Sequence, residues 1–384
     1  MLPVSRPSLG REELAAVKAV LDSGWLASGP RCRELEEKVA ALSGVAHGVA
    51  FMSATDGLFL TLKAKGIGPG DEVVVPSYTF AATANTVVHC GAKPVFADID
   101  RRTLNIDPDD AARRITPRTR ALVPVHFAGA PCDMDRLLRL ARSRGLFIMA
   151  DAAHALGAEY KGRPVGRCAD ASIYSFHPMK NITTAEGGML VTDDGGLAAR
   201  ALRLRFHGIA QEAWAREKGA APARTALEPG YKSNLPDLLA AVGVAQLKRL
   251  DKNNARRRRL VALYARRLAE AGIPGVEVPP GPRYDHVSAC HVMIALVDFP
   301  GLGADREDFI RRMAAENIGC AVHYIAVHLH PYYRSEHPAP SGSLPETEYV
   351  SARTLTLPLF PDMEDSDVDD VVAALARVVD GYRR

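Results

Sequence analysis

Short apolar runs alternate with helix-like segments through the first two thirds of the chain. Six of these runs end in polar or turn residues: Glu72–Ser77, Pro94–Asp100, Ala121–Phe127, Leu146–Ala153, Ser172–Phe176 and Gly188–Asp194. Between the third and fourth runs, Met134, Leu137, Leu138 and Ala141 follow the i, i+3, i+4, i+7 spacing of a helix. This alternation predicts a mostly parallel α/β sheet, in which ligands gather at the carboxyl ends of the strands.

The last third has a different pattern. A long, Arg-rich amphipathic helix is predicted from about Asp251, followed by a strand in His291–Phe299, a helix in Arg306–Ile318 and a last helix in Asp367–Val379. We therefore expect two domains, a large α/β domain over residues 1–248 and a smaller α+β domain over residues 249–384.

Charge and cysteine usage exclude several classes of protein. The net charge of the 384 residues is only +3, and the charges are mixed, which argues against nucleic acid or a membrane surface as a partner. The densest basic run, Asn254–Leu260, is predicted to be a solvated helix face. Six scattered cysteines without a CxxC motif predict neither a disulfide framework nor a zinc site. With no signal-like apolar segment and no apolar run of 18 residues, we expect a cytoplasmic protein without a transmembrane helix.

A lysine and an aspartate carry the strongest chemical signal. Asp151 follows the apolar run Leu146–Ala150, and Lys180 follows the strand-like Ser172–Phe176 by a few residues. One strand–connection–strand unit could bring both to the same sheet edge, where they could simply form an ion pair. A lysine that sheds its proton is also a nucleophile for carbonyls, and a carboxylate can keep a pyridine nitrogen protonated. Together they suggest pyridoxal phosphate.

Two small-residue motifs have ordinary alternatives. Ser53–Gly57 ("SATDG") precedes a helix-like segment and could present free N–H groups to a phosphate, or could be an ordinary N-cap. Gly66–Gly70 ("GIGPG") imitates a dinucleotide fingerprint, but it precedes a strand instead of following one, so it indicates a helix end and a turn.

Ordered motifs along nearly the whole chain resemble the DegT/DnrJ/EryC1/StrS family of sugar aminotransferases, which have the pyridoxal-phosphate fold type I. They are Gly66–Asn85, Pro94–Asp100, Thr103–Pro108, Asp151–Gly166, Ser175–Asp194 ("SFHPMKNITTAEGGMLVTDD"), Arg205–Ile209, Gly230–Asp251 and Leu357–Met363. The resemblance implies a large, mostly parallel sheet domain with a smaller C-terminal α+β domain, and pyridoxal 5'-phosphate as cofactor.

The resemblance also implies roles for individual residues. Lys180 would form the Schiff base and move the proton during transfer, and Asp151 would pair with the pyridinium nitrogen. Phe80 would stack on the ring, although a core aromatic is the alternative. His154 would lie near the phenolic oxygen. The phosphate would be bound by Ser175, Thr55, the amide of Asp56, whose side chain would cap the helix, and Asn234 of a neighbouring subunit, so a homodimer is expected.

The resemblance implies glutamate as amino donor and a nucleotide-linked 4-keto sugar as acceptor. Within the family, "VPVHFAGAPCDMD", "LRFHGI" followed by "EAW", and "LEPGYKSNLPDL" resemble enzymes that make UDP-4-amino-4-deoxy-L-arabinose. Phe80, Ser233 and "HYIAVHLHPYYR" (His323–Arg334) depart from that type, and the last resembles enzymes of 4-keto-6-deoxy hexoses. A UDP-4-keto-pentose is the first expectation, and a UDP-, dTDP- or GDP-linked hexose is the alternative.

Several residues are candidates for the substrate side. Arg205 and Lys232 could bind a pyrophosphate, or could be solvated surface charges. Trp25 could close over the substrate, or could be a core tryptophan. His323 and His328 are assigned to the substrate, and although His323, His328 and His330 invite a metal site, no metal is expected. A non-catalytic regulator that binds the sugar is the alternative from another class, and the presence of Lys180 and Asp151 disfavours it.

Overall fold

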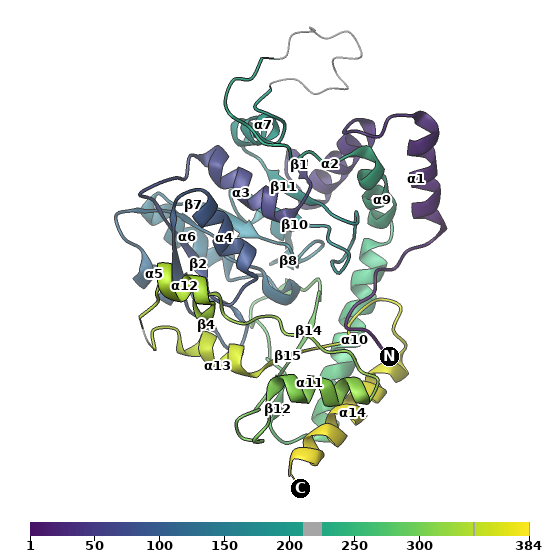
Figure 1. The fold of residues 1–384 in the computed structure, drawn as a ribbon. Helices are drawn as coiled ribbons and strands as arrows, with labels where there is room; N and C mark the ends of the chain where they lie inside the picture. The colour runs from purple at the N-terminus through teal and green to yellow at the C-terminus, as the bar shows by residue number, and fades with distance from the viewer. Residues whose placement is uncertain (210–224, 341, 384) are drawn as a thin grey trace.

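The computed structural model describes residues 1–209, 225–340 and 342–383, so the "EAW" motif at 212–214 lies outside the described residues. A seven-stranded sheet occupies the first part of the chain, in the order β1-β11-β10-β7-β6-β2-β3 (Figure 1). Its strands are β1 (His47–Phe51), β2 (Glu72–Pro76), β3 (Lys93–Ala97), β6 (Thr119–Leu122), β7 (Phe147–Asp151), β10 (Ala171–Ser175) and β11 (Gly188–Thr192).

The sheet is mostly parallel, as predicted. Strands β3, β2, β6, β7 and β10 pair in parallel, and β11 runs antiparallel to both β10 and β1. Each of the six predicted apolar runs overlaps a strand of this sheet, although β6 shares only Ala121 and Leu122 with its run. The run Pro94–Asp100 also contains the short β4 (Ile99–Asp100), which pairs with β5 (Asn105–Ile106). Strand β1 was not predicted, because only its last three residues, Val49–Phe51, are buried.

Helices cover both faces of this sheet, because successive side chains of a strand point to opposite faces. Val73 and Val75 pack with α3 (Ala54–Lys65), α4 (Ala81–His89) and α7 (Gly195–Leu204) in one core cluster. Val74 between them joins a different cluster. The opposite face is covered by α2 (Pro30–Ser43), α5 (Pro108–Arg114), the predicted helix α6 (Met134–Arg144) and α9 (Asp237–Leu247), with α1 (Arg11–Ser23) packed on α9.

A second hydrophobic core is built in the last third of the chain. Its antiparallel sheet has the order β12-β14-β15, over Val276–Glu277, Met293–Val297 and Thr354–Leu357. Helices α10 (Leu250–Ala271), α11 (Arg306–Ala315) and α14 (Asp365–Arg383) pack on it, which confirms the predicted helices and strand of this region.

The prediction of a solvated face for the basic run on α10 is wrong for one of its four arginines. Arg257 is buried and donates hydrogen bonds to the carbonyl oxygens of His291 and Leu359. Its neighbours Arg256 and Arg259 pair with Asp365 on α14. The helix therefore uses this run to hold the second core together as well as to meet solvent.

Several segments cross between the two parts of the chain. Strand β13 (His286–Val287) joins β8 (Glu159–Tyr160) and β9 (Arg163–Pro164) in a small sheet, and the 3-10 turn Val327–Leu329 leads to α12 (Pro331–Glu336) and α13 (Pro345–Arg353). Val327 and Tyr333 pack into the core of the large sheet, whereas Leu2 packs against the second core. The division at residue 248 stays a prediction.

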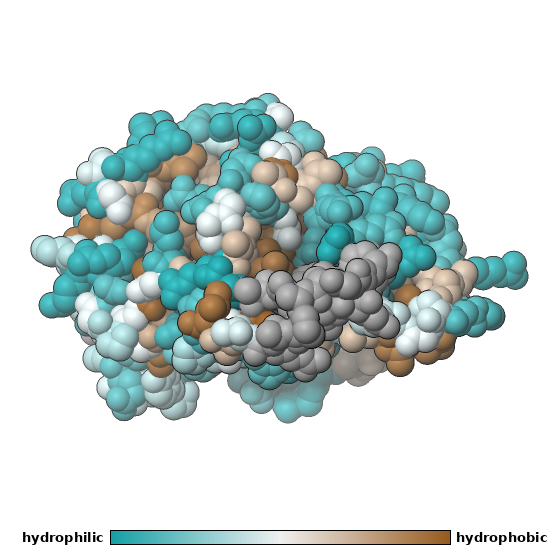
Figure 2. Space-filling model, turned by 90° about the horizontal axis from the view of Figure 1, so that it is seen from above, coloured by the Kyte–Doolittle hydropathy of each residue, from teal (hydrophilic) through white to brown (hydrophobic). Residues whose placement is uncertain are grey.

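No helix in residues 1–209, 225–340 and 342–383 combines the length and the hydropathy that crossing a bilayer requires. Figure 2 shows one face of the molecule, on which hydrophilic residues are mixed with smaller groups of hydrophobic ones.

Candidate active site

A pocket opens where neighbouring strands of the large sheet end. Asp151 is the last residue of β7, Ser175 is the last residue of β10, and Val125 follows β6 and bridges to Asp151. These strands are parallel, so their carboxyl ends meet at one edge of the sheet. All three residues line one cavity of about 250 Å³.

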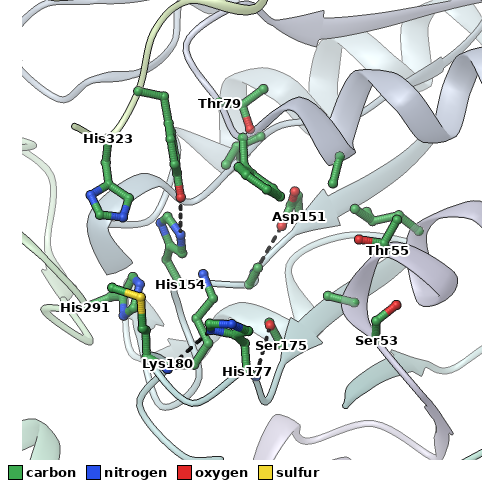
Figure 3. Close-up of a pocket in the computed structure, with 18 of the residues that line it drawn as sticks. Ser53, Thr55, Thr79, Asp151, His154, Ser175, His177, Lys180, His291 and His323 are labelled. Atoms are coloured by element: carbon green, nitrogen blue, oxygen red, sulfur yellow. Dashed lines mark hydrogen bonds between the residues drawn. The ribbon is translucent and has the colours of Figure 1, made fainter. Parts of the chain in front are cut away.

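The polar side chains of this pocket fall into two groups (Figure 3). Hydroxyl groups from Ser53, Thr55 and Ser175 lie on one side, and the imidazoles of His291 and His323 lie on the other. The remaining lining residues are Ala54, Leu58, Thr79, Phe80, Ala82, Val125, Asp151, Ala153, His154, His177, Met179, Lys180, Glu186, Gly187 and Tyr324.

Lys180 reaches this pocket from the loop between β10 and β11 (Figure 3). Its backbone N–H donates to the carbonyl oxygen of His177, which closes a turn in that loop. Burial lowers the pKa of Lys180 to about 8, and the negative charge of Asp151 opposes that shift. Near neutral pH a larger fraction of this amine is therefore deprotonated than in an ordinary lysine, and the deprotonated form is the one that attacks a carbonyl.

Asp151 is held in place by two hydrogen bonds. The Thr83 hydroxyl donates to Oδ2 at 2.8 Å, and the Ala153 N–H donates to Oδ1 at 3.1 Å. Burial raises the pKa of Asp151, while these two bonds and the charge of Lys180 lower it. Thr83 lies on α4 and is itself hydrogen-bonded to Thr79 at 2.9 Å. The sequence did not point to Thr83, because it is far from Asp151 in the chain and belongs to no charged pattern.

The hydroxyl side of the pocket is the start of α3. Ser53 is the N-cap, and its Oγ accepts the Asp56 N–H at 3.0 Å. The prediction that Asp56 caps the helix is therefore wrong, and its amide is already paired. The Asp56 carboxyl hydrogen-bonds Ser53 and Ser233, and burial raises its pKa. Thr55 and Ser175 line the pocket as expected, whereas Asp56 does not.

Aromatic rings form the other side. The imidazole Nε2 of His154 lies 3.1 Å from the Tyr324 hydroxyl, and Nδ1 of His154 is buried without a hydrogen bond. The ring of Tyr324 lies 5.7 Å from that of Phe80. The Phe80 side chain is 59% exposed, so the alternative of a core aromatic is excluded. His323 also lines the pocket and contacts the Thr356 hydroxyl through Nδ1 at 2.9 Å.

Two predicted substrate residues are buried away from the pocket. Arg205 pairs with Glu36 and donates to the carbonyl oxygen of Ala50 at 2.7 Å. His328 contacts the Ser77 hydroxyl through Nδ1 at 2.7 Å and approaches Glu348. Arg205 is therefore not a solvated surface charge, and neither side chain lines the pocket that contains Lys180.

The described residues contain no cluster of side chains that would support the alternative of a metal site. The strand that would give His328 and His330 a common face is instead a 3-10 turn, Val327–Leu329. Within residues 1–209, 225–340 and 342–383, no group of three His, Cys, Asp or Glu side chains is placed to hold a metal ion.

Three more predicted residues form a group outside the lining of the pocket. The indole N–H of Trp25 donates to the carbonyl oxygen of Ser28 at 3.4 Å. The amide of Asn234 donates to the Ser28 hydroxyl at 2.6 Å and accepts from Lys232 at 2.5 Å. The ammonium of Lys232 also lies 4.6 Å from the centre of the Phe206 ring. The structure thus brings these residues to each other instead of to Lys180.

The side chains that line the pocket match the chemical groups of pyridoxal phosphate. A lysine with a lowered pKa, a fixed carboxylate and a helix start with hydroxyl groups face one cavity. The unpaired buried Nδ1 of His154 leaves one polar atom for a bound group to satisfy. These are the groups that an aldehyde, a pyridine nitrogen, a phosphate and a phenolic oxygen require.

Comparison with known proteins agrees with this geometry. The spore coat polysaccharide biosynthesis protein SpsC of Bacillus subtilis is 46% identical over 382 residues, which cover 99% of this chain and 97% of that protein. DesI, whose crystal structure was solved in the presence of its TDP-sugar product, shares 36% sequence identity with this chain. The two structures superpose with a TM-score of 0.86 over 100% of this chain and 94% of DesI. The sugar aminotransferase Spr1654 of Streptococcus pneumoniae, described as putative and solved in its PMP form, is 31% identical, with a TM-score of 0.91 over all of both chains.

The family model of the DegT/DnrJ/EryC1/StrS aminotransferases matches residues 7–376. Solved structures in PLP and PMP forms share the fold. With its lysine and aspartate facing one pocket, the chain is a pyridoxal-phosphate-dependent sugar aminotransferase and belongs to the DegT/DnrJ/EryC1/StrS family.

Proposed function

We propose that this aminotransferase moves the amino group of glutamate to the 4-keto carbon of a nucleotide-linked sugar. The observation that carries the proposal is the presence of Lys180 and Asp151 in one pocket, with the pKa of Lys180 lowered to about 8. Pyridoxal phosphate, when bound, supplies the electron sink that makes the hydrogen on the amine-bearing carbon acidic.

Each remaining role in cofactor binding and proton transfer falls to a different residue of the pocket. Lys180 would hold the cofactor covalently, and its amine would move a proton between the two carbons that exchange it. Asp151 would keep the pyridine nitrogen protonated, and His154 would bond the phenolic oxygen. Phe80, which is exposed and lines the pocket, would cover the ring.

The phosphate belongs at the hydroxyl side. Ser53 already caps α3, so Thr55, Ser175 and the free N–H groups of the first turn bind the phosphate. Asn234 of the partner subunit completes this site in a homodimer. Asn234 lies outside the pocket of its own chain, which leaves it available for a second copy.

Glutamate and the nucleotide-linked sugar bind to the same pocket, one after the other. His323 is the predicted substrate residue that lines it, while Trp25 and Lys232 approach the substrate only if they reach the pocket of the partner. The scattered cysteines favour a cytoplasmic location for this reaction.

A UDP-4-keto-pentose is the first candidate acceptor, because of the arabinose-type motifs. A dTDP-linked 4-keto-6-deoxy hexose is the second, favoured by the segment His323–Arg334 and by the likeness to DesI, whose structure holds a TDP-sugar product. The likeness to SpsC favours a role in polysaccharide biosynthesis.

A visible spectrum tests the proposal. The purified protein should show a yellow band with pyridoxal phosphate, glutamate should bleach it, and one of a panel of UDP-, dTDP- and GDP-linked 4-keto sugars should restore it. A yellow band that no 4-keto sugar restores after bleaching would refute the proposed acceptor class. A protein that never turns yellow would instead favour a non-catalytic, sugar-binding member of the family.

A further inference from the structure

His291 contacts His154 inside the active-site pocket. The two ring centres lie 4.3 Å apart with an angle of 39° between the planes, and the side chains are 3% and 5% exposed. Both rings line the cavity that contains Lys180. His291 lies just before β14, in the part of the chain that forms the second core, so no sequence pattern linked it to His154.

The ring of His154 is enclosed from several sides. His291 packs on it, Tyr324 stacks nearly parallel to it at 6.1 Å and bonds Nε2, and Phe127 lies 5.8 Å away. His291 is the member of this set that comes from the segment before β14. Removing its ring would open space beside His154 that water could enter.

The position of His291 is itself firmly held. Its backbone N–H donates to the carbonyl oxygen of Ala128 at 2.9 Å, and the buried Arg257 donates to its carbonyl oxygen at 3.1 Å. The first bond ties His291 to the 3-10 turn Phe127–Gly129, and the second ties it to α10. His291 thus has a fixed backbone on both sides, as a residue that orients another side chain requires.

The environment favours the neutral form of both imidazoles. Burial lowers the pKa of His154 well below its usual value, and the charge of Lys180 and the neighbouring His323 act in the same direction. Burial likewise lowers the pKa of His291, with His154, Lys180 and Arg257 adding to the effect. The other titratable side chains that line the pocket are Asp151, His177, Glu186 and Tyr324.

We propose that His291 is a positioning residue of this active site: by packing on His154 it excludes water from that ring and keeps it neutral, with Nε2 on Tyr324 and Nδ1 directed to a bound group. A protonated His154 would bring a second positive charge next to Lys180. Its Nε2 would then carry a proton and could not accept a hydrogen bond from the Tyr324 hydroxyl, which lies 3.1 Å away.

Ring NMR of His154 tests this without cofactor or substrate, so the result is independent of the proposed sugar. In wild-type protein with labelled imidazoles, assigned with His154→Gln, the His154 signals should stay those of a neutral ring from pH 8 to pH 5. In His291→Ala, water should reach the ring and His154 should titrate within that range. In His291→Phe, which keeps the packing but has no ring nitrogen, His154 should stay neutral.

Activity gives a second readout in the same variants. The rate at which glutamate bleaches the bound cofactor should fall about 10- to 100-fold in His291→Ala, because catalytic groups act only when well placed. His291→Phe should recover most of that loss, and His47→Ala, which removes an exposed histidine on β1, should behave as wild type. Thermal unfolding checks the fold, and His291→Asn, with its smaller side chain, replaces His291→Ala if that variant does not fold.

Two results would overturn the proposal. One is a His291→Ala protein in which His154 stays neutral and glutamate reacts at the wild-type rate. The other is an equal loss of rate in His291→Ala and His291→Phe with His154 neutral in both, because the nitrogens of His291 would then matter and its packing would not.

Discussion

Replacing Thr83 by valine should impair catalysis although Thr83 is not a charged residue. Valine has nearly the shape of threonine, so the main loss is the 2.8 Å hydrogen bond from the hydroxyl to Oδ2 of Asp151. Thr83 is about 1% exposed, so water cannot readily replace that bond. The Asp151 carboxylate would keep only the Ala153 N–H as a donor to Oδ1.

The expected size follows from the charge of the acceptor. A hydrogen bond to a charged group contributes about 1.5–3 kcal/mol. If all of it is lost where Asp151 must stay ionised, the rate falls about 10- to 150-fold, since 1.36 kcal/mol corresponds to a factor of ten. The loss raises the pKa of Asp151 further, so the pairing with a protonated pyridine nitrogen weakens and the defect should be larger at lower pH.

The assay is the glutamate half-reaction, followed by stopped-flow absorbance at saturating pyridoxal phosphate between pH 6 and pH 9. Thr86→Val is the matched control, because Thr86 is also buried on α4 but its hydroxyl donates to the carbonyl oxygen of Thr83 at 3.1 Å and does not contact Asp151. Equal rates for Thr83→Val and Thr86→Val would refute the reasoning.

Three further predictions concern the lysine and the shared phosphate site. Lys180→Ala should abolish transamination, as measured by absorbance and activity, while the unfolding temperature measured by calorimetry stays close to that of the wild type. Transamination activity in this variant would show that Lys180 is not part of the mechanism. Capture of added pyridoxal phosphate by cofactor-free protein should speed up as pH rises through about 8 and then level off, because the neutral amine predominates above its pKa; a midpoint above pH 10 would mean that the pocket does not lower the pKa. Asn234→Asp should weaken cofactor retention by adding an anion near the phosphate, as measured by dialysis and absorbance, whereas Ser28→Ala, which removes only the hydroxyl that Asn234 contacts, should retain more cofactor; equal retention would argue against a shared site.

The local sequence pattern was sufficient for most of the architecture. Apolar runs that end in polar residues predicted the strands, because buried parallel strands need continuous apolar residues and ligand-binding residues follow their ends. It also predicted that Asp151 and Lys180 would meet, because one strand–connection–strand unit separates them. Helix α10 followed from its amphipathic spacing, but the burial of Arg257 did not, because periodicity does not tell which arginine finds carbonyl acceptors.

The substrate-side candidates show where local pattern fails. The sequence made Arg205 a candidate for pyrophosphate binding or a solvated surface charge, but the fold places Glu36 beside it and buries the arginine. His328 was expected to share one face of a strand with His330, but the segment forms a 3-10 turn. The imidazole of His328 instead contacts Ser77, about 250 residues away in the sequence. In both cases the deciding contact comes from a segment remote in sequence.

The sequence by itself determined the fold class, the lysine and aspartate of the site and the family that they indicate. Each depends on short-range features, the period of apolar residues and the order of motifs along the chain. Only the tertiary structure decided that Thr83 holds Asp151, that Tyr324 and His291 enclose His154, and that Arg205 and His328 are withdrawn from the pocket. Hydrogen bonds and ring contacts act over a few ångströms in space, and the chain returns to the same place only after tens or hundreds of residues.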